Sequence, residues 1–185
     1  QLLYAIVRNR AKHGQVRGVA GTLMTNLALE HALDRLDIPF ARAAVGDRYV
    51  LEMLQDRGWI YGGENSGHII ALDRHTTGDG TVAALQVLAA LRESDGDLAS
   101  LLGDLELYPQ KLINVPMVRG FPWQDDDSIH GARADIEKRL SGRGRVLLRA
   151  SGTEPLLRVM VEGEDATEVH EAAEELARVV REAGQ

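Results

Sequence analysis

One glycine-rich loop, Gly62-Gly63-Glu64-Asn65-Ser66-Gly67-His68, combines a carboxylate, an amide, a hydroxyl and an imidazole within a few consecutive residues. Its glycines allow the backbone to turn sharply and to come close to a ligand. Glu64 can accept hydrogen bonds from two neighbouring hydroxyl groups, and the hydroxyl of Ser66 can either donate or accept. This combination suits a polyhydroxylated ligand. A polar hairpin turn without any ligand is the alternative, and composition alone favours that alternative.

A second loop, Arg149-Ala150-Ser151-Gly152-Thr153-Glu154-Pro155, offers hydroxyl groups and backbone N–H groups on a tight turn, which suits an anion. Arg149 and Arg158 can add bidentate charged hydrogen bonds. Residues 138–158 carry six basic side chains against the single acid Glu154: Lys138, Arg139, Arg143, Arg145, Arg149 and Arg158. The alternative is that these cations are solvated or lie at a helix C-terminus, where the helix dipole favours them. The residues alone leave both interpretations open.

Strands and helices alternate in the first half of the chain, which predicts a mostly parallel sheet covered on both faces. The G-x-G-x-x-A pattern beginning at Gly78 favours a helix entry capped by Thr77 or Asp79, because no following strand carries a ribose-binding acid. Asp47 is expected to cap the helix before Gly58. The predicted helices are 1–14, 26–37, 47–58 and 77–92, and the predicted strands are 16–23, 40–45, 59–61 and 68–72.

The pattern changes after about Gly103, and the elements then follow the order β-α-β-β-α. Pro116 favours an edge position for the first of these strands. The predicted strands are 112–118, 145–149 and 156–162, and the predicted helices are 125–140 and 166–183. The fold class is therefore α/β, with a mixed, mostly parallel sheet and flanking helices in residues 1–104. A small α+β domain in residues 110–185 follows, with helices packed on an antiparallel sheet.

Composition excludes several classes of protein. Hydrophobic residues make up 44% and charged residues 26%, a globular balance. The net charge of −7 gives no general attraction to nucleic acid or to an anionic membrane. The absence of cysteine excludes disulfides, thiolate metal sites and a cysteine nucleophile. No run approaches the roughly 20 apolar residues of a membrane-spanning helix, and no secretion signal is visible, so a cytoplasmic protein is expected.

Together the two loops resemble those of the α-D-phosphohexomutase superfamily. The segment Gly63-Glu64-Asn65-Ser66-Gly67-His68 is similar to its sugar-binding loop, and Arg149 to Pro155 with Arg158 is similar to its phosphate-binding loop. Val45 to Val50 and Thr76 to Gly80 look closest to the bacterial phosphoglucosamine mutase branch. The superfamily has four domains, and this chain resembles only the third and fourth. The chain also opens without a helix cap, as expected for a truncated protein.

The resemblance implies roles for individual residues. Glu64, Asn65 and Ser66 would bind the sugar, whereas the phosphate would be bound by Arg149, Ser151, Gly152, Thr153 and Arg158. Asp47, Arg48 and His68 would face the transfer centre and support it. The family's phosphoserine, in a Ser-His-Asn-Pro segment, and its Asp-x-Asp-x-Asp magnesium loop have no counterpart here. Hence neither a catalytic nor a metal-binding residue is expected in this chain.

The resemblance further implies the C-terminal, substrate-binding half of an enzyme that interconverts glucosamine 6-phosphate and glucosamine 1-phosphate. The reaction would pass through a phosphoserine and a bisphosphorylated intermediate. The expected partners are a hexosamine phosphate and the protein's own N-terminal domains, which would bind Mg²⁺, so the chain alone would be inactive. A non-catalytic phosphosugar-binding module, or a phosphomannomutase or phosphoglucomutase of the same superfamily, are the alternatives. The sequence does not indicate an oligomeric state.

Overall fold

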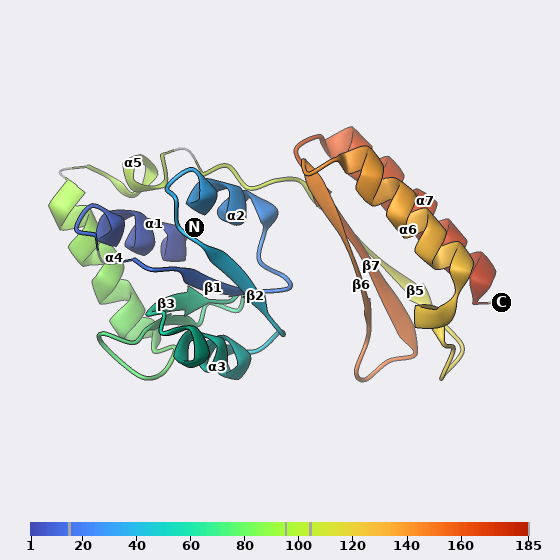
Figure 1. Ribbon diagram of the computed structural model, residues 1–185, viewed down its shortest axis with the longest axis horizontal. Coiled ribbons are helices and arrows are strands. Elements are labelled where there is room, and N and C mark those ends of the chain that lie inside the picture. Colours follow the sequence, from blue (N-terminus) through green and yellow to red (C-terminus); the bar gives the residue numbers. More distant parts are fainter. Residues whose placement is uncertain (15, 95, 104, 185) are drawn as a thin grey trace. The chain divides into compact units, whose positions relative to one another are not determined.

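The computed structural model describes residues 1–14, 16–94, 96–103 and 105–184 (Figure 1). The chain divides into two compact units, Gln1–Leu107 and Tyr108–Gln185. Asp104 and Gln185, the residues with which the two predicted domains end, lie outside the described residues.

The first unit is built on a four-stranded sheet in the order β2-β1-β3-β4. Strands β2 and β3 run parallel to β1, whereas β4 is antiparallel to β3 and forms a hairpin with it. The bounds are β1 (Val19–Thr22), β2 (Phe40–Ala43), β3 (Tyr61–Gly63) and β4 (Ile69–Ala71). The prediction of a mixed, mostly parallel sheet is therefore confirmed.

Helices cover both faces of this sheet (Figure 1). Val19 of β1 packs in a cluster with side chains of the first two helices, whereas the adjacent Ala20 packs with Val50 and Leu54 of the third. Successive side chains of a strand point to opposite faces, so the two clusters lie on opposite sides of the sheet. The helices are α1 (Leu2–Ala11), α2 (Leu27–Asp34), α3 (Asp47–Arg57), α4 (Gly80–Ser94) and α5 (Leu98–Leu102).

One predicted helix cap was correct and another was wrong. Asp79 caps α4 by accepting the N–H of Val82 at 2.9 Å, so the G-x-G-x-x-A segment is a helix entry. Asp47 does not cap α3, because the N-cap residue is Gly46 at φ 132° and Asp47 is already the first helical residue. Its carboxylate instead accepts the N–H of the next residue, Arg48. The short helix α5 was not predicted.

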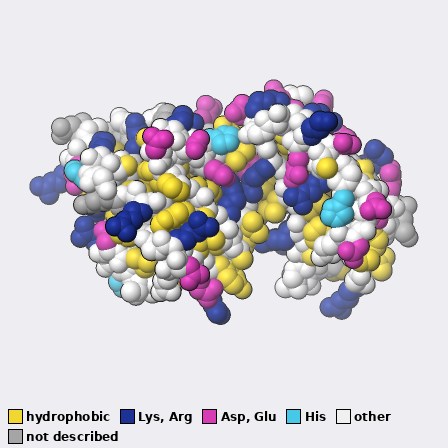
Figure 2. All heavy atoms as spheres, in the orientation of Figure 1, with side chains coloured by type: hydrophobic (Ala, Val, Ile, Leu, Met, Phe, Trp, Pro, Cys, Tyr) yellow, Lys and Arg dark blue, Asp and Glu magenta, His cyan; other side chains and the backbone are white. Residues whose placement is uncertain are grey.

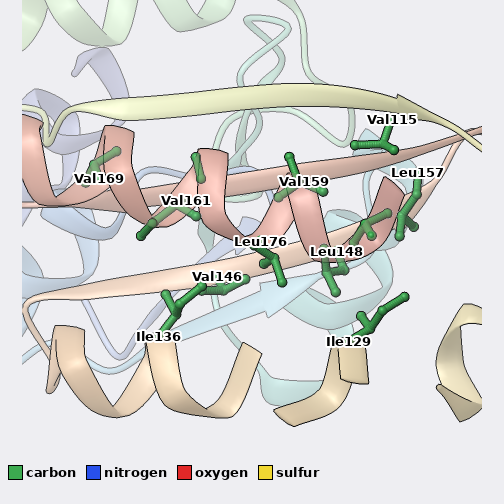
Figure 3. Close-up of a cluster of buried hydrophobic side chains, with 14 of the residues drawn as sticks. Val115, Ile129, Ile136, Val146, Leu148, Leu157, Val159, Val161, Val169 and Leu176 are labelled. Carbon is green, nitrogen blue, oxygen red and sulfur yellow. The ribbon is translucent and has the colours of Figure 1, made fainter. Parts of the chain in front are cut away.

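The second unit contains a three-stranded antiparallel sheet in the order β5-β7-β6, with β5 at the edge as Pro116 predicts. Helices α6 and α7 pack on one face of this sheet and enclose a core that includes Val159, Ile136 and Leu176 (Figure 3). This confirms the predicted α+β arrangement. The elements are β5 (Gln110–Pro116), η1 (Trp123–Asp125), α6 (Asp127–Leu140), β6 (Gly144–Ala150), β7 (Leu156–Gly163) and α7 (Ala166–Ala183).

The two faces of the second sheet have different chemistry. Leu157, Val159 and Val161 of β7 point into the core beneath the helices. Because side chains alternate along a strand, Arg158 and Glu162 lie on the face that α6 and α7 leave uncovered.

Candidate functional site

The β3–β4 hairpin positions the first loop. The N–H of Glu64 donates to the carbonyl of His68, and the N–H of Gly67 donates to the carbonyl of Glu64, each at 3.1 Å. Gly67 has a φ of 100°, a left-handed conformation that a glycine adopts without the steric cost of a side chain. The loop is therefore a short closed turn with Glu64, Ser66 and His68 at its rim.

These three side chains form a hydrogen-bonded group, which we call the Glu64–Ser66–His68 cluster. The hydroxyl of Ser66 donates to Oε1 of Glu64 at 2.5 Å, and Nδ1 of His68 lies 2.9 Å from the Ser66 hydroxyl and 3.1 Å from the same Oε1. Since the hydroxyl proton goes to the carboxylate, this geometry favours a protonated Nδ1 that donates to both oxygens. The Nε2 of a neutral ring is then left as a hydrogen-bond acceptor.

Glu64 is ionised at neutral pH. The hydrogen bond from Ser66 is the largest cause that lowers its pKa, burial opposes it, and hydrogen bonds from His68 and from the N–H of Gly46 lower the pKa further. Only 10% of the Glu64 side chain is exposed, against 50% for His68. The cluster thus presents an anionic acceptor and a half-exposed imidazole, groups that can bind hydroxyls.

The other residues predicted in this region have different surroundings. Asn65 donates from Nδ2 to the carbonyl of Met24 at 3.0 Å, so its amide ties the loop to the segment after β1. Arg48 is 80% exposed and forms an ion pair with Glu52 at 2.8 Å. In the described part of the chain, neither Asp47 nor Arg48 bonds to the cluster, although the backbone of the preceding Gly46 helps to lower the pKa of Glu64.

A cavity of about 390 Å³ adjoins the first loop, and Glu64 and Asn65 line it together with Thr25 and Asn26. Sequence reasoning missed Thr25 and Asn26, because nothing in the pattern indicated that the end of β1 approaches the hairpin. Another cavity, of about 520 Å³, is lined by Glu30, His31 and neighbouring residues and borders neither predicted loop.

The β6–β7 hairpin positions the second loop. The N–H of Ser151 donates to the carbonyl of Leu156 at 2.9 Å, and the hydroxyl of Ser151 accepts the N–H of Glu154 at 3.3 Å. Among the described residues, the N–H groups of Gly152 and Thr153 have no hydrogen-bond acceptor. The exposed tip of the loop therefore offers two free backbone donors beside two hydroxyls, a suitable arrangement for an anion.

The arginines predicted near this loop separate into two groups. Arg139, Arg143 and Arg145 form ion pairs with acids of β7 and α7, namely Glu175, Glu168 and Glu162. Arg149 and Arg158 have no acidic partner in the part of the chain that the structure describes. Figure 2 shows basic and acidic side chains interspersed over the visible face of each unit.

These two arginines are neighbours. Arg149 lies opposite Arg158 in the β6–β7 register, and Nε of Arg158 is buried without a hydrogen-bond partner among the residues that the structure describes. Like charges on directly opposite residues destabilise a sheet, and an unsatisfied buried donor costs further free energy. A bound anion would relieve both costs, which makes this pair the strongest electrostatic indication of an anion site.

A cavity of about 700 Å³ borders the second loop. Ser151, Gly152 and Thr153 line it on one side, and the segment from Met117 to Gln124, which includes Trp123, lines it on the other. Arg149 and Arg158 are not among its lining residues. Sequence reasoning assigned Phe121-Pro122-Trp123 to a turn and missed this neighbourhood, since a turn signal does not indicate what the turn contacts.

Within the described ranges, no three His, Asp or Glu side chains are grouped so as to bind a metal ion. Of the consecutive acids at the start of α6, Asp126 serves as its N-cap and accepts the N–H groups of Ser128 and Ile129. Among the helices that the structure describes, none has the length and apolar character needed to cross a membrane.

Fold and site together define a two-unit α/β protein with a polar hairpin loop suited to ligand binding in each unit. Residues 1–108 match the family model for the α/β/α domain III of phosphoglucomutase/phosphomannomutase, and residues 112–179 match the model for its C-terminal domain. The chain belongs to the phosphoglucomutase/phosphomannomutase family, which confirms the predicted family resemblance.

Curated relatives share much of the sequence. Phosphoglucosamine mutase of Dechloromonas aromatica is 75% identical over 100% of this chain, and that of Aromatoleum aromaticum is 60% identical over 99% of it. This chain spans 41% of the length of each of these relatives.

Solved structures share the fold. A structure of Aspergillus fumigatus N-acetylphosphoglucosamine mutase matches with a TM-score of 0.81 at 19% identity, covering 99% of this chain and 42% of that one. A phosphoglucomutase/phosphomannomutase family protein from Burkholderia thailandensis matches with a TM-score of 0.69 at 17% identity, covering 98% of this chain and 41% of that one.

Proposed function

We propose that this chain is the substrate-binding part of a phosphoglucosamine mutase, which interconverts glucosamine 6-phosphate and glucosamine 1-phosphate. The observation that carries this proposal is the 75% identity to the Dechloromonas aromatica phosphoglucosamine mutase along the whole chain. Because the chain spans 41% of that relative, the phosphoserine that donates and regains the phosphoryl group would come from the remaining part of the enzyme.

The Glu64–Ser66–His68 cluster would hold the sugar ring. An ionised Glu64 accepts hydrogen bonds from two adjacent hydroxyls, and Ser66 can donate or accept as the ring requires. Such a site can bind the ring in either orientation, which a reaction through a bisphosphorylated intermediate needs. His68, with Asp47 and Arg48 at the start of α3, would border the transferring phosphoryl group and balance its charge.

The second loop would hold the phosphate that is not reacting. The donors are the free N–H groups of Gly152 and Thr153, the hydroxyls of Ser151 and Thr153, and the guanidinium groups of Arg149 and Arg158. Charged hydrogen bonds contribute about 1.5–3 kcal/mol each, but association itself is costly. We therefore expect this chain alone to bind a hexose phosphate with a Kd of about 1 mM.

The proposal places magnesium in the remaining part of the enzyme. One Aspergillus fumigatus N-acetylphosphoglucosamine mutase structure is a complex with GlcNAc-6P and magnesium, whereas the described residues here offer no metal-binding group. In such an enzyme the ion would neutralise charge on the phosphoryl group. This chain's own contribution is to bind and orient the sugar phosphate.

A chimera tests the proposal. The matching segment of the Dechloromonas aromatica enzyme is replaced by this chain, and conversion of glucosamine 6-phosphate is measured with magnesium present. We expect activity within about tenfold of the parent enzyme, which corresponds to about 1.4 kcal/mol of lost transition-state stabilisation, and a preference over glucose and mannose phosphates. A folded chimera without glucosamine phosphate turnover would contradict the proposal, as would turnover by this chain alone.

A further inference from the structure

The segment Thr76–Gly80, which leads into α4, packs directly against His68. A Cβ atom placed on Gly78 would lie 2.7 Å from Cβ of His68 and 3.2 Å from its Cα. These atoms belong to the base of the side chain and to the backbone, so they cannot rotate away as the end of a flexible side chain can. As long as His68 stays where it is, position 78 therefore has no room for any side chain larger than the hydrogen of glycine.

The second glycine of the segment differs in this respect. Nothing lies within 4 Å of a Cβ placed on Gly80, the first residue of α4. Neither Gly78 nor Gly80 has a positive φ, so neither position requires glycine for its backbone conformation. What distinguishes Gly78 is its contact with His68.

The segment around Gly78 is also anchored. Asp79 accepts the N–H of Val82 at 2.9 Å, and the hydroxyl of Thr77 lies 2.9 Å from Nδ1 of His75. Because both neighbours of Gly78 are tied by hydrogen bonds, the segment does not readily move away from His68, and a larger residue at position 78 would press on that residue.

We propose that Gly78 is a positioning residue that holds His68 where its Nδ1 reaches both Ser66 and Glu64. With the residue held there, the hydrogen bonds to Ser66 and Glu64 favour the tautomer protonated on Nδ1 and leave Nε2 as the acceptor. The consequence for sugar binding rests on the proposed function, but the effect of Gly78 on the imidazole does not depend on it.

The test compares Gly78→Ala with the matched control Gly80→Ala in this chain. Nitrogen NMR of the imidazole rings reports the tautomer of His68, and a titration with glucosamine 6-phosphate reports binding. We expect the wild type and Gly80→Ala to keep a protonated Nδ1, and Gly78→Ala to lose it and to bind the sugar phosphate at least about threefold more weakly. An unchanged His68 tautomer in folded Gly78→Ala would overturn the proposal.

Gly78→Ala alone could fail to fold, so the same substitution is also made in a variant that lacks the His68 side chain. His68→Gly removes the Cβ that the new methyl group would strike, so Gly78→Ala should be tolerated far better beside His68→Gly than alone. Equal loss of folding in both backgrounds would overturn the proposal. If even the wild type shows no binding of glucosamine 6-phosphate, the proposed function fails, while the His68 tautomer still decides the role of Gly78.

Discussion

Arg149 and Arg158 lie directly opposite each other on strands β6 and β7, and neither has an acidic partner among the described residues. Four positions earlier on β6, Arg145 faces Glu162 of β7 and forms an ion pair with it. The same pair of strands is therefore matched in charge at one end and mismatched at the end nearest the second loop. An anion held at that loop, as we propose, would compensate the mismatch.

The first prediction concerns phosphate. Without an anion, Arg149→Gln should leave the free energy of unfolding unchanged or raise it by about 0.2–1 kcal/mol, because a like-charge contact is removed. With phosphate at about twenty times its Kd, the free energy of unfolding of the wild type should rise by about 1.8 kcal/mol. The free energy of unfolding of Arg149→Gln should rise clearly less. Thermal unfolding at increasing phosphate concentrations measures both effects.

The matched control for this prediction is Arg178→Gln. Arg178 pairs with Glu182 on α7, and both side chains are 61% exposed, so its loss should change stability little and leave the phosphate dependence intact. If Arg149→Gln responds to phosphate as strongly as the wild type and this control, the arginine pair does not bind the anion.

The second prediction concerns the buried ion pair. Glu162 is fully buried; Arg145 compensates its charge, and Nε2 of Gln110 donates a hydrogen bond to its carboxylate at 3.2 Å. Arg145→Met should lower the free energy of unfolding by about 3–5 kcal/mol, because it leaves a buried carboxylate without its cation. Urea unfolding measures this loss.

Arg139→Met is the control for the buried pair. Arg139 and Glu175 are 46% and 41% exposed, and an exposed pair contributes at most about 1 kcal/mol. If Arg145→Met and Arg139→Met lower the free energy of unfolding equally, burial of Glu162 does not make its ion pair more important for stability than an exposed pair.

The third prediction concerns the pH dependence of the cluster. Ser66→Ala removes the largest cause that lowers the pKa of Glu64, so that pKa should rise in a carbon NMR titration of the carboxyl group. A carboxyl with a lowered folded-state pKa stabilises the fold above its unfolded pKa and loses this contribution as pH falls through the folded pKa. The stability difference between wild type and Ser66→Ala should therefore be largest near neutral pH and shrink in acid.

Ser100→Ala serves as the control, because Ser100 makes a similar hydroxyl bond to Asp97 at 2.7 Å, away from the first loop. It should alter the titration of Asp97 and leave that of Glu64 unchanged. A Glu64 pKa that is the same in Ser66→Ala and wild type would contradict the hydrogen-bonding scheme of the cluster.

Much of the fold follows from local sequence signals. The helix predicted at 166–183 has the bounds of α7, because Val169, Leu176 and Val180 recur at helical spacing and Asp165 caps the start. The strands of the second unit were predicted within a few residues for a similar reason, since glycines and charged residues bound their apolar runs.

The sites were less predictable, because they depend on contacts between distant segments. The sequence grouped Arg145 with Arg149 and Arg158, and only the strand register shows that Arg145 is neutralised by Glu162. The bond from Asn65 to Met24 and the contact between Gly78 and His68 likewise join segments that no local pattern connects.

The central claim is that the first loop binds the sugar of a hexose phosphate and the second loop binds its phosphate. A titration of this chain with glucosamine 6-phosphate, followed by NMR at Ser66 and at Thr153, tests it directly. We predict that both signals shift, that inorganic phosphate shifts mainly Thr153, and that glucosamine shifts mainly Ser66. A saturating concentration of glucosamine 6-phosphate that leaves either signal unchanged would contradict the claim.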